Sequence, residues 1–102
     1  MNVKFKIKNN TLYIVLLGEL DEHTASYTRS EIDKLFMLDG FTQVIIDLSE
    51  LSFMDSTGIG VLIGRYKILK TKNIPIFVCN PSNHVERIFK MTGLYKIMPK
   101  IG

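Results

Sequence analysis

The sequence predicts an α/β fold in which a mixed, mostly parallel β-sheet is flanked by α-helices. Two β-type runs open the chain, and from there β-type runs alternate with segments of helical spacing. Strands joined by a tight turn run antiparallel, whereas strands separated by helices run parallel with right-handed crossovers. At 102 residues and 46% hydrophobic content, we expect a single domain over residues 1–102 with one core.

The first two strands are predicted to form a hairpin. Apolar residues alternate with lysines over residues 3–7, which is the period-two pattern of a half-buried strand. Asn9-Asn10 then supplies turn residues that tolerate positive φ. Residues 12–17 are apolar on both faces and predict a more fully buried strand, which Gly18-Glu19-Leu20-Asp21 ends.

The middle of the chain predicts a helix, a strand and a second helix. Residues 22–38 keep roughly helical apolar spacing, and Asp39-Gly40 ends that helix. Residues 44–48 are a β-branched run and predict a central strand. Apolar residues again gather on one side of residues 57–69, where a helix is expected to end near Asn73.

The last part of the chain predicts a strand, a helix and a short final strand. Residues 74–78 are β-type, and Pro75 places this strand towards a sheet edge. Asn80-Pro81 resembles a helix start, with the asparagine as cap and the proline at the first helical position. Gly93 closes that helix, and residues 95–98 are expected to form a last strand.

Composition excludes several classes of protein. The net charge is +3, but the lysines of residues 4–8 alternate along one strand face, and those of residues 67–72 close a helix. No basic stripe interleaved with aromatics points to nucleic acid. Cys79 is the single cysteine, so no internal disulfide forms. No run is long enough to span a bilayer or to act as a secretion signal, and we expect a cytoplasmic protein.

The segment that carries chemistry is residues 51–60, which lead from the central strand into the following helix. In an open α/β sheet, ligands and chemistry gather at the carboxyl ends of strands. A phosphate on Ser56 would meet the positive end of the helix dipole, a favourable term of about 0.3–1 kcal/mol, although Asp55 opposes it. Gly58 and Gly60 would let other groups approach the backbone closely.

Two other interpretations compete at this segment. Asp55 and Ser56 are both good helix N-caps, so a purely structural serine stays open. Catalysis is less consistent with the pattern, because Gly58-x-Gly60 has neither dinucleotide nor phosphate-loop spacing. The only histidines, His23 and His84, fall at the starts of other helices in no catalytic motif. We therefore expect no catalytic residue, no metal site and no cofactor.

A second feature is the acidic group Glu19, Asp21 and Glu22. It follows a strand expected to lie beside the central one, which would place it at the same sheet end as Ser56. Asp21 could simply cap the next helix, since acidic groups are favoured in a first helical turn. Alternatively, the three carboxylates form a patch that recruits a basic partner surface, and the sequence leaves both open.

Three segments together resemble the anti-sigma factor antagonists of the STAS domain family, and most of all those of the sporulation sigma factor F pathway. The segments are 18–25, 51–67 and 87–94, within a resemblance that covers about residues 3–98. The run LSFMDSTGIG over residues 51–60 is the specific part, because hydrophobic strands alone are common to many folds. Relatives usually continue into a final helix, whereas this sequence stops at Lys100-Ile101-Gly102, and we expect the switch segment to function without it.

The resemblance implies a regulatory binding protein and not an enzyme. The unphosphorylated form would bind an anti-sigma factor, a serine kinase of the histidine-kinase-like ATPase fold, and so free sigma factor F. Phosphorylation of Ser56 would end binding, and a PP2C-type phosphatase would restore it. We expect a monomer when free, with no direct contact to nucleic acid or membrane. The partner-binding residues would be Glu19, Asp21, Asp55, Ser56, Thr57, Gly58 and Gly60.

Alternatives to this prediction stay open at the level of sequence. The same module could serve a general stress sigma pathway, which the pattern separates only weakly. A small nucleotide- or anion-binding α/β module could instead use the Ser56 segment as its pocket, and a helix-capped scaffold would have no switch at all.

Overall fold

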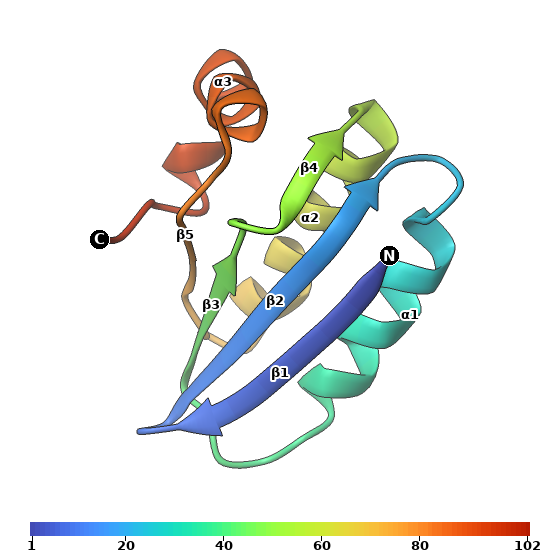
Figure 1. The fold of residues 1–102 in the computed structure, drawn as a ribbon. Coiled ribbons are helices and arrows are strands. Elements are labelled where there is room, and N and C mark those ends of the chain that lie inside the picture. Colours follow the sequence, from blue (N-terminus) through green and yellow to red (C-terminus); the bar gives the residue numbers. More distant parts are fainter.

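Five strands and three α-helices, followed by a short 3₁₀ helix, form the fold in the computed structural model, which describes residues 1–102 (Figure 1). The first half contains β1 (Asn2–Lys8), β2 (Thr11–Leu20), α1 (Ala25–Phe36), β3 (Gln43–Asp47) and β4 (Leu51–Met54). The second half contains α2 (Ser56–Thr71), β5 (Ile76–Cys79), α3 (Asn83–Thr92) and the 3₁₀ helix η1 (Leu94–Lys96).

The sheet is mixed and mostly parallel, as predicted. Its strand order is β1-β2-β3-β5, with β4 paired to β2 alone. β1 and β2 are antiparallel, while the β2–β3, β2–β4 and β3–β5 pairs are parallel. β2 is long enough to serve two partners, β3 as far as Val15 and β4 from Gly18 onwards. A bulge between Gly18 and Glu19 marks the point where β2 changes its partner strand. Gly18 has a φ of +120°, a backbone conformation that requires glycine.

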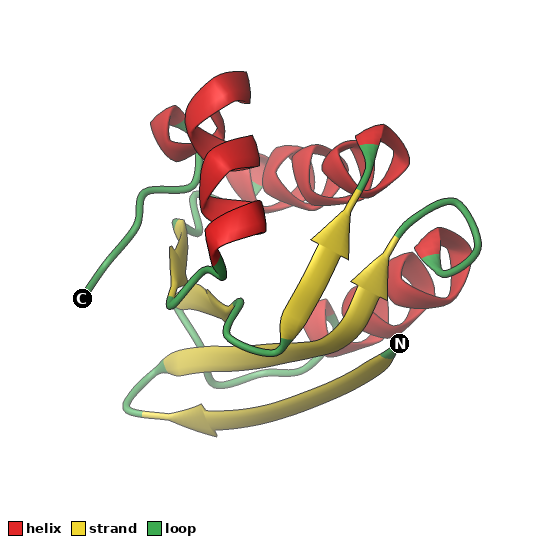
Figure 2. Cartoon of the chain, turned by 45° about the horizontal axis from the view of Figure 1, so that its top comes forward, coloured by secondary structure: helices red, strands yellow, loops and turns green.

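Helices α1 and α2 cover one face of the sheet, and α3 lies at the sheet end beside β4 (Figures 1 and 2). Alternate residues of β2 point into the helical layer, so Leu12, Ile14 and Leu16 are fully buried. They pack in one core with Ile32 of α1 and Leu62 of α2. No helix is both long and apolar enough to cross a membrane.

Several predicted boundaries are confirmed by the backbone. Asn9 and Asn10 have φ of 53° and 60° in the hairpin turn, and Asn73 after α2 has φ of 58°. Gly93 is the left-handed C-cap of α3, with φ of 75°. β5 is an edge strand, as Pro75 predicted.

β4 is a strand that the sequence did not reveal, since residues 51–54 read as part of a loop. Leu51 and Met54 are buried while Ser52 and Phe53 are exposed, which is not the period-two pattern of a strand. The pairing with the far end of β2 makes this segment a strand, and that pairing is a tertiary contact.

The predicted last strand over residues 95–98 is wrong. After Gly93, the chain turns into η1, where the Lys96 N–H donates to the Gly93 carbonyl at 3.0 Å. The chain reaches the sheet only afterwards, through a single parallel bridge between Val78 and Lys100. The left-handed cap sends the chain into a tight turn, so an apolar run that could form a strand becomes helical.

Three other boundaries also differ from those predicted. β2 continues to Leu20, because β4 pairs with its end, so the glycine at position 18 bends the strand without ending it. α1 begins at Ala25 and not near residue 22. Asn80 does not cap α3: it has φ of 54°, and the Ser82 hydroxyl accepts the Val85 N–H at 3.4 Å.

The α3 helix is held to the C-terminal segment by Glu86. Its carboxylate accepts hydrogen bonds from the Tyr95 hydroxyl and from Lys100 Nζ, the latter at 3.0 Å. Lys90 lies 3.4 Å away as an additional ion pair. The hydrogen bonds from Tyr95 and then Lys100 lower the pKa of Glu86 to about 2, whereas burial and then the contact with Glu86 raise the pKa of Tyr95.

We expect Tyr95→Phe to destabilise the protein at neutral pH and less so in acid. The ionised Glu86 contributes stability above its ordinary pKa of 4.5, and this contribution is lost as pH falls towards 2. The melting temperature of Tyr95→Phe should therefore approach that of the unaltered protein across this range. Tyr66→Phe is the matched control, because the Tyr66 hydroxyl has no such partner. If Tyr95→Phe lowered the melting temperature equally at neutral pH and near pH 2, that result would contradict the role of Glu86.

Candidate functional site

The candidate site lies where β2 and β4 end side by side, at the upper end of the sheet in Figure 1. Glu19 pairs with Phe53 and Leu20 with Met54, so the two chains leave the sheet together. One continues into the acidic loop before α1 and the other into α2. The structure thus brings the acidic group and the Ser56 segment together, although they are more than thirty residues apart in sequence.

Asp55 links these two segments through both carboxylate oxygens. Its Oδ1 accepts the Gly58 N–H at 3.0 Å and caps α2, while its Oδ2 accepts the Glu22 N–H at 3.3 Å. The backbone N–H of Asp55 donates to the Leu20 carbonyl at 3.3 Å. Asp55 is therefore the N-cap of α2, and the alternative in which Ser56 serves as the cap is wrong.

Ser56 is the first residue of α2, and its side chain is exposed. Its hydroxyl makes no hydrogen bond within the protein, and the neighbouring Thr57 is exposed as well. No histidine or carboxylate is hydrogen-bonded to Ser56 to act as a base. The first N–H groups of a helix lack intrahelical acceptors and form its positive dipole end. Ser56 thus presents a free hydroxyl in a field that tolerates an anion.

The two glycines after Ser56 have different roles. A Cβ on Gly58 would lie 2.3 Å from the Leu20 carbonyl oxygen and 2.8 Å from Met54 Cγ, so this buried glycine lets α2 pack on β2. The sequence suggested that Gly58 would open the backbone to an outside group. This prediction is wrong, because Gly58 is packed against β2 and β4. Gly60 is exposed with open space around its Cβ position, and Gly64 one turn later is similar. Of the two glycines after Ser56, only Gly60 borders open space.

The acidic loop is braced by one of its own carboxylates. Asp21 Oδ1 accepts the N–H groups of His23 at 2.9 Å and Thr24 at 3.1 Å. The Thr24 hydroxyl in turn donates to the Glu19 carbonyl at 2.7 Å. Asp21 therefore shapes the approach to α1 without being its N-cap, which is Thr24. The side chains of Glu19 and Glu22 stay exposed, so the loop also presents negative charge.

Phe53 is a surface residue of this region that sequence reasoning missed. It is 39% exposed, and its ring stacks on His84 of α3 with centroids 5.1 Å apart and planes at 11°. A phenylalanine inside an apolar run normally indicates a core position, so no local signal identified it. Because β4 packs beside α3, the exposed ring of Phe53 meets His84 there.

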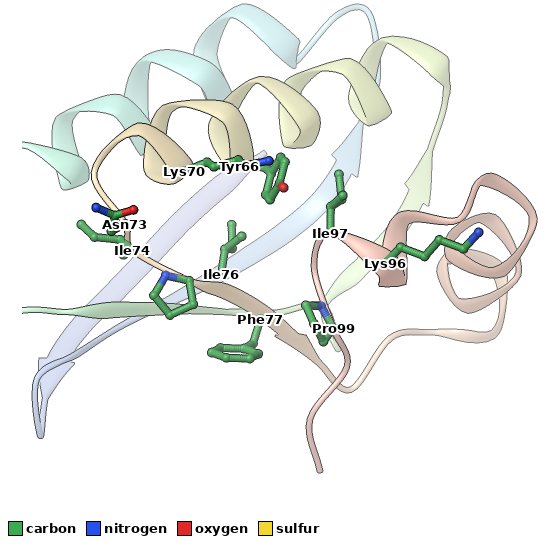
Figure 3. A pocket seen from close by; sticks show the side chains of 10 residues that line it. Tyr66, Lys70, Asn73, Ile74, Ile76, Phe77, Lys96, Ile97 and Pro99 are labelled. Atoms are coloured by element: carbon green, nitrogen blue, oxygen red, sulfur yellow. The ribbon is translucent and has the colours of Figure 1, made fainter.

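No hollow of the surface is lined by residues 51–60. The hollow in Figure 3, of about 420 Å³, lies at the other end of α2, between Tyr66, Lys70, Ile76 and Ile97. No group of three or more histidine, cysteine, aspartate or glutamate side chains gathers where it could hold a metal ion. What the Ser56 region offers is an open, partly acidic surface with one free hydroxyl.

The fold is thus an α/β domain with a mixed sheet and an open, partly acidic surface at one end of that sheet. The chain belongs to the STAS domain family, whose family model ("STAS domain") matches residues 2–102. The resemblance of the sequence to this family is thereby confirmed.

Curated relatives are antagonists of anti-sigma factors. The anti-sigma F factor antagonist of Paenibacillus polymyxa is 37% identical over 101 residues, which cover 97% of this chain and 86% of that protein. The anti-sigma-B factor antagonist of Listeria monocytogenes is 33% identical over 101 residues, with 96% and 88% covered. These relationships support the role of an anti-sigma factor antagonist, which is a regulatory role.

The solved structures agree with this relationship. The anti-sigma factor antagonist SpoIIAA in its unphosphorylated form superposes with a TM-score of 0.77 at 31% identity, covering 99% of this chain and 89% of that one. The phosphorylated form of the Bacillus cell fate determinant SpoIIAA gives a TM-score of 0.69 at 30% identity, with 99% and 92% covered.

We expect Gly58→Ala to lower stability by about 1–3 kcal/mol, because the added methyl group forces α2 away from the Leu20 carbonyl. Gly60→Ala should raise stability by up to about 1 kcal/mol, since its Cβ meets open space and alanine favours a helix. Urea unfolding of both variants tests this contrast. Similar effects at the two positions would show that α2 does not pack on β2 as described.

Asp55→Ala should lower the free energy of unfolding by about 1 kcal/mol, through loss of the helix cap and of the link to Glu22. Asp55→Asn keeps an oxygen acceptor and should cost less. Asp39→Ala is the matched control, because Asp39 is exposed and makes no hydrogen bond. Chemical denaturation measures all three, and equal stability of Asp55→Ala and Asp39→Ala would contradict the link.

Proposed function

We propose that this protein is an anti-sigma factor antagonist switched by phosphorylation of Ser56. The unphosphorylated form binds an anti-sigma factor that is also a serine kinase, and so releases the sporulation sigma factor F. The kinase phosphorylates Ser56 and ends binding, and a PP2C-type phosphatase reverses the mark. The free, exposed hydroxyl of Ser56 at the start of α2 is the observation that carries this proposal.

A kinase needs an accessible hydroxyl whose modification does not unfold the substrate. Ser56 fulfils this requirement because Asp55, and not Ser56, makes the capping hydrogen bond to Gly58. A phosphate on Ser56 leaves that bond in place and meets the positive end of α2, worth about 0.3–1 kcal/mol. The carboxylate of Asp55 opposes it, which suits a reversible mark. The phosphorylated form in which SpoIIAA has been solved supports the comparison.

The partner surface we propose surrounds Ser56. It combines the exposed side chains of Glu19 and Thr57 and the carboxylate of Asp21 with the open space at Gly60. Asp55 and Gly58 act in it by shaping the start of α2. The negative charge of the loop favours a basic partner surface, and the absence of a side chain at Gly60 allows close approach.

Phosphate ends binding in this proposal because Ser56 lies inside the contact surface. The modification adds about −1.5 to −2 charges, which must be desolvated against groups not arranged to receive them. A cost of about 3 kcal/mol weakens binding by more than a hundredfold. No backbone rearrangement is required, because the cap of α2 and the Asp55–Glu22 link are left intact.

The sigma pathway is the finer part of the proposal. The 37% identity to an anti-sigma F factor antagonist favours sporulation, while the 33% identity to an anti-sigma-B factor antagonist keeps the stress pathway as the second candidate. Affinity for the anti-sigma F and anti-sigma-B factors of one organism, measured side by side, separates the two. A nucleotide- or anion-binding module has less support, since no hollow is lined by the Ser56 segment.

Incubation with ATP and the cognate kinase should place one phosphate on Ser56, located by mass spectrometry. Ser56→Asp should weaken partner binding at least tenfold, about 1.4 kcal/mol, whereas Ser56→Ala should bind and resist inactivation. Ser30→Asp is the matched control, because it adds the same charge at an exposed position of α1. Calorimetry or surface plasmon resonance gives the affinities.

Two results would contradict the switch. Phosphate on another residue would show that Ser56 is not the substrate. Equal affinities for Ser56→Asp and Ser30→Asp would show that the start of α2 lies outside the contact surface.

A further inference from the structure

The outer edge of β1 is free along its whole length. β1 is the first strand in the sheet order and pairs only with β2 (Figure 1). The N–H and C=O groups on the outer edge of such a strand have no partner in the sheet and can pair with another extended chain. A seven-residue strand offers about 20 Å of this edge.

The two faces of β1 carry different chemistry. Lys4, Lys6 and Lys8 project from the face away from the helices, and none of them is in an ion pair. Phe5 and Ile7 lie on the helical face, opposite the buried residues of β2, yet they are 51% and 36% exposed. The sequence predicted that this apolar face would be half-buried, but at the outermost strand the helical layer covers it only in part.

Helix α1 and the residues just after it extend this apolar surface. Tyr27 and Glu31 lie one turn apart on the side of α1 away from Asp33, which pairs with Arg65 of α2 at 3.0 Å, and Leu38 follows the end of the helix. Tyr27 and Leu38 are 49% and 41% exposed. The charge of Glu31 is balanced by Lys34 at 2.9 Å.

Four exposed apolar side chains therefore lie on β1, on the helix in contact with it, and just after that helix: Phe5, Ile7, Tyr27 and Leu38. They are half of the eight large apolar side chains that the protein exposes. An apolar strip next to a free strand edge is an unusual combination, because such edges are normally protected.

A second copy of the same chain does not fit this edge. Antiparallel pairing centred on Phe5 would place Lys4 opposite Lys6 of the second copy. Parallel pairing in register would place each lysine beside its own equivalent. Like charges directly opposite one another destabilise strand pairing, so the lysines select against self-association.

We propose that β1 accepts an extended segment of another protein as an additional strand, and that this segment alternates acidic and apolar residues. Backbone hydrogen bonds would form along the free edge, and the acidic side chains would face Lys4, Lys6 and Lys8. The apolar side chains would cover Phe5 and Ile7 beside α1. This surface shares no residue with the Ser56 site, so it goes beyond the proposed switch and does not depend on it.

The test uses an N-acetylated, C-amidated peptide of the length of β1 with alternating glutamate and valine. In a titration followed by ¹⁵N NMR, shifts should concentrate on β1, on Tyr27 of α1 and on Leu38 just after it. A peptide with lysine in place of glutamate should bind at least about tenfold more weakly. A peptide with a central proline should also lose binding, because proline lacks the N–H that the edge needs.

Charge reversal on the protein gives the matched comparison. The double variant Lys4→Glu/Lys6→Glu should bind the glutamate peptide at least about tenfold more weakly, and it should bind the lysine peptide more tightly than the unaltered protein does. Lys67→Glu/Lys72→Glu changes the net charge by the same amount, at positions on and just after α2. This variant should bind both peptides with the affinity of the unaltered protein. The peptide series acts on the unaltered protein, so the test does not depend on the folding of any variant.

Four results would overturn the proposal. They are absence of glutamate-peptide binding, shifts centred on Ser56, equal binding by the two double variants, and self-association through β1 detected by sedimentation. The same titration with Ser56→Asp should give unchanged affinity, and a loss there would show that the two surfaces are one.

Discussion

The pairing of the end of β2 with β4 positions both segments of the candidate site, the acidic loop before α1 and the start of α2. It brings the Leu20 backbone against the start of α2, which is possible only because Gly58 has no side chain. Asp55 then completes the arrangement, since one carboxylate oxygen caps α2 and the other accepts the Glu22 N–H. A single carboxylate thus joins the helix start to the acidic loop and leaves the next hydroxyl unengaged.

This division of roles between adjacent residues leaves a serine hydroxyl free at a helix start, as the proposed switch requires. If Ser56 were itself the cap, phosphorylation would replace a structural hydrogen bond and couple the modification to helix stability. With Asp55 in that position, the hydroxyl of Ser56 is available, and the proposed phosphate would change the surface alone. In the proposed switch, the fold stays constant while the contact surface changes its charge.

The molecule presents two surfaces of opposite character. Around Ser56 it is acidic, through Glu19 and Glu22, and carries no side chain at Gly60. Along β1 it is basic on one side and apolar on the other, beside an unpaired strand edge. The first surface suits a folded partner that docks on a helix start, and the second suits an extended segment that completes a sheet.

The sequence by itself determined the α/β class, most element positions and the hairpin turn at Asn9-Asn10, because these depend on local periodicity and turn chemistry. Ser56 became the candidate residue through its place after the central strand and through the resemblance of residues 51–60 to the STAS family, since helix-start preferences alone favoured a capping role. Only the tertiary structure decided that residues 51–54 form a strand and that residues 95–98 do not. It also decided which of Asp55 and Ser56 caps α2: both are good caps, and in the structure the Asp55 carboxylate accepts the Gly58 N–H while it also holds the Glu22 N–H. Long-range pairing leaves no periodic signal in a four-residue segment, so the geometry of the site had to come from the fold.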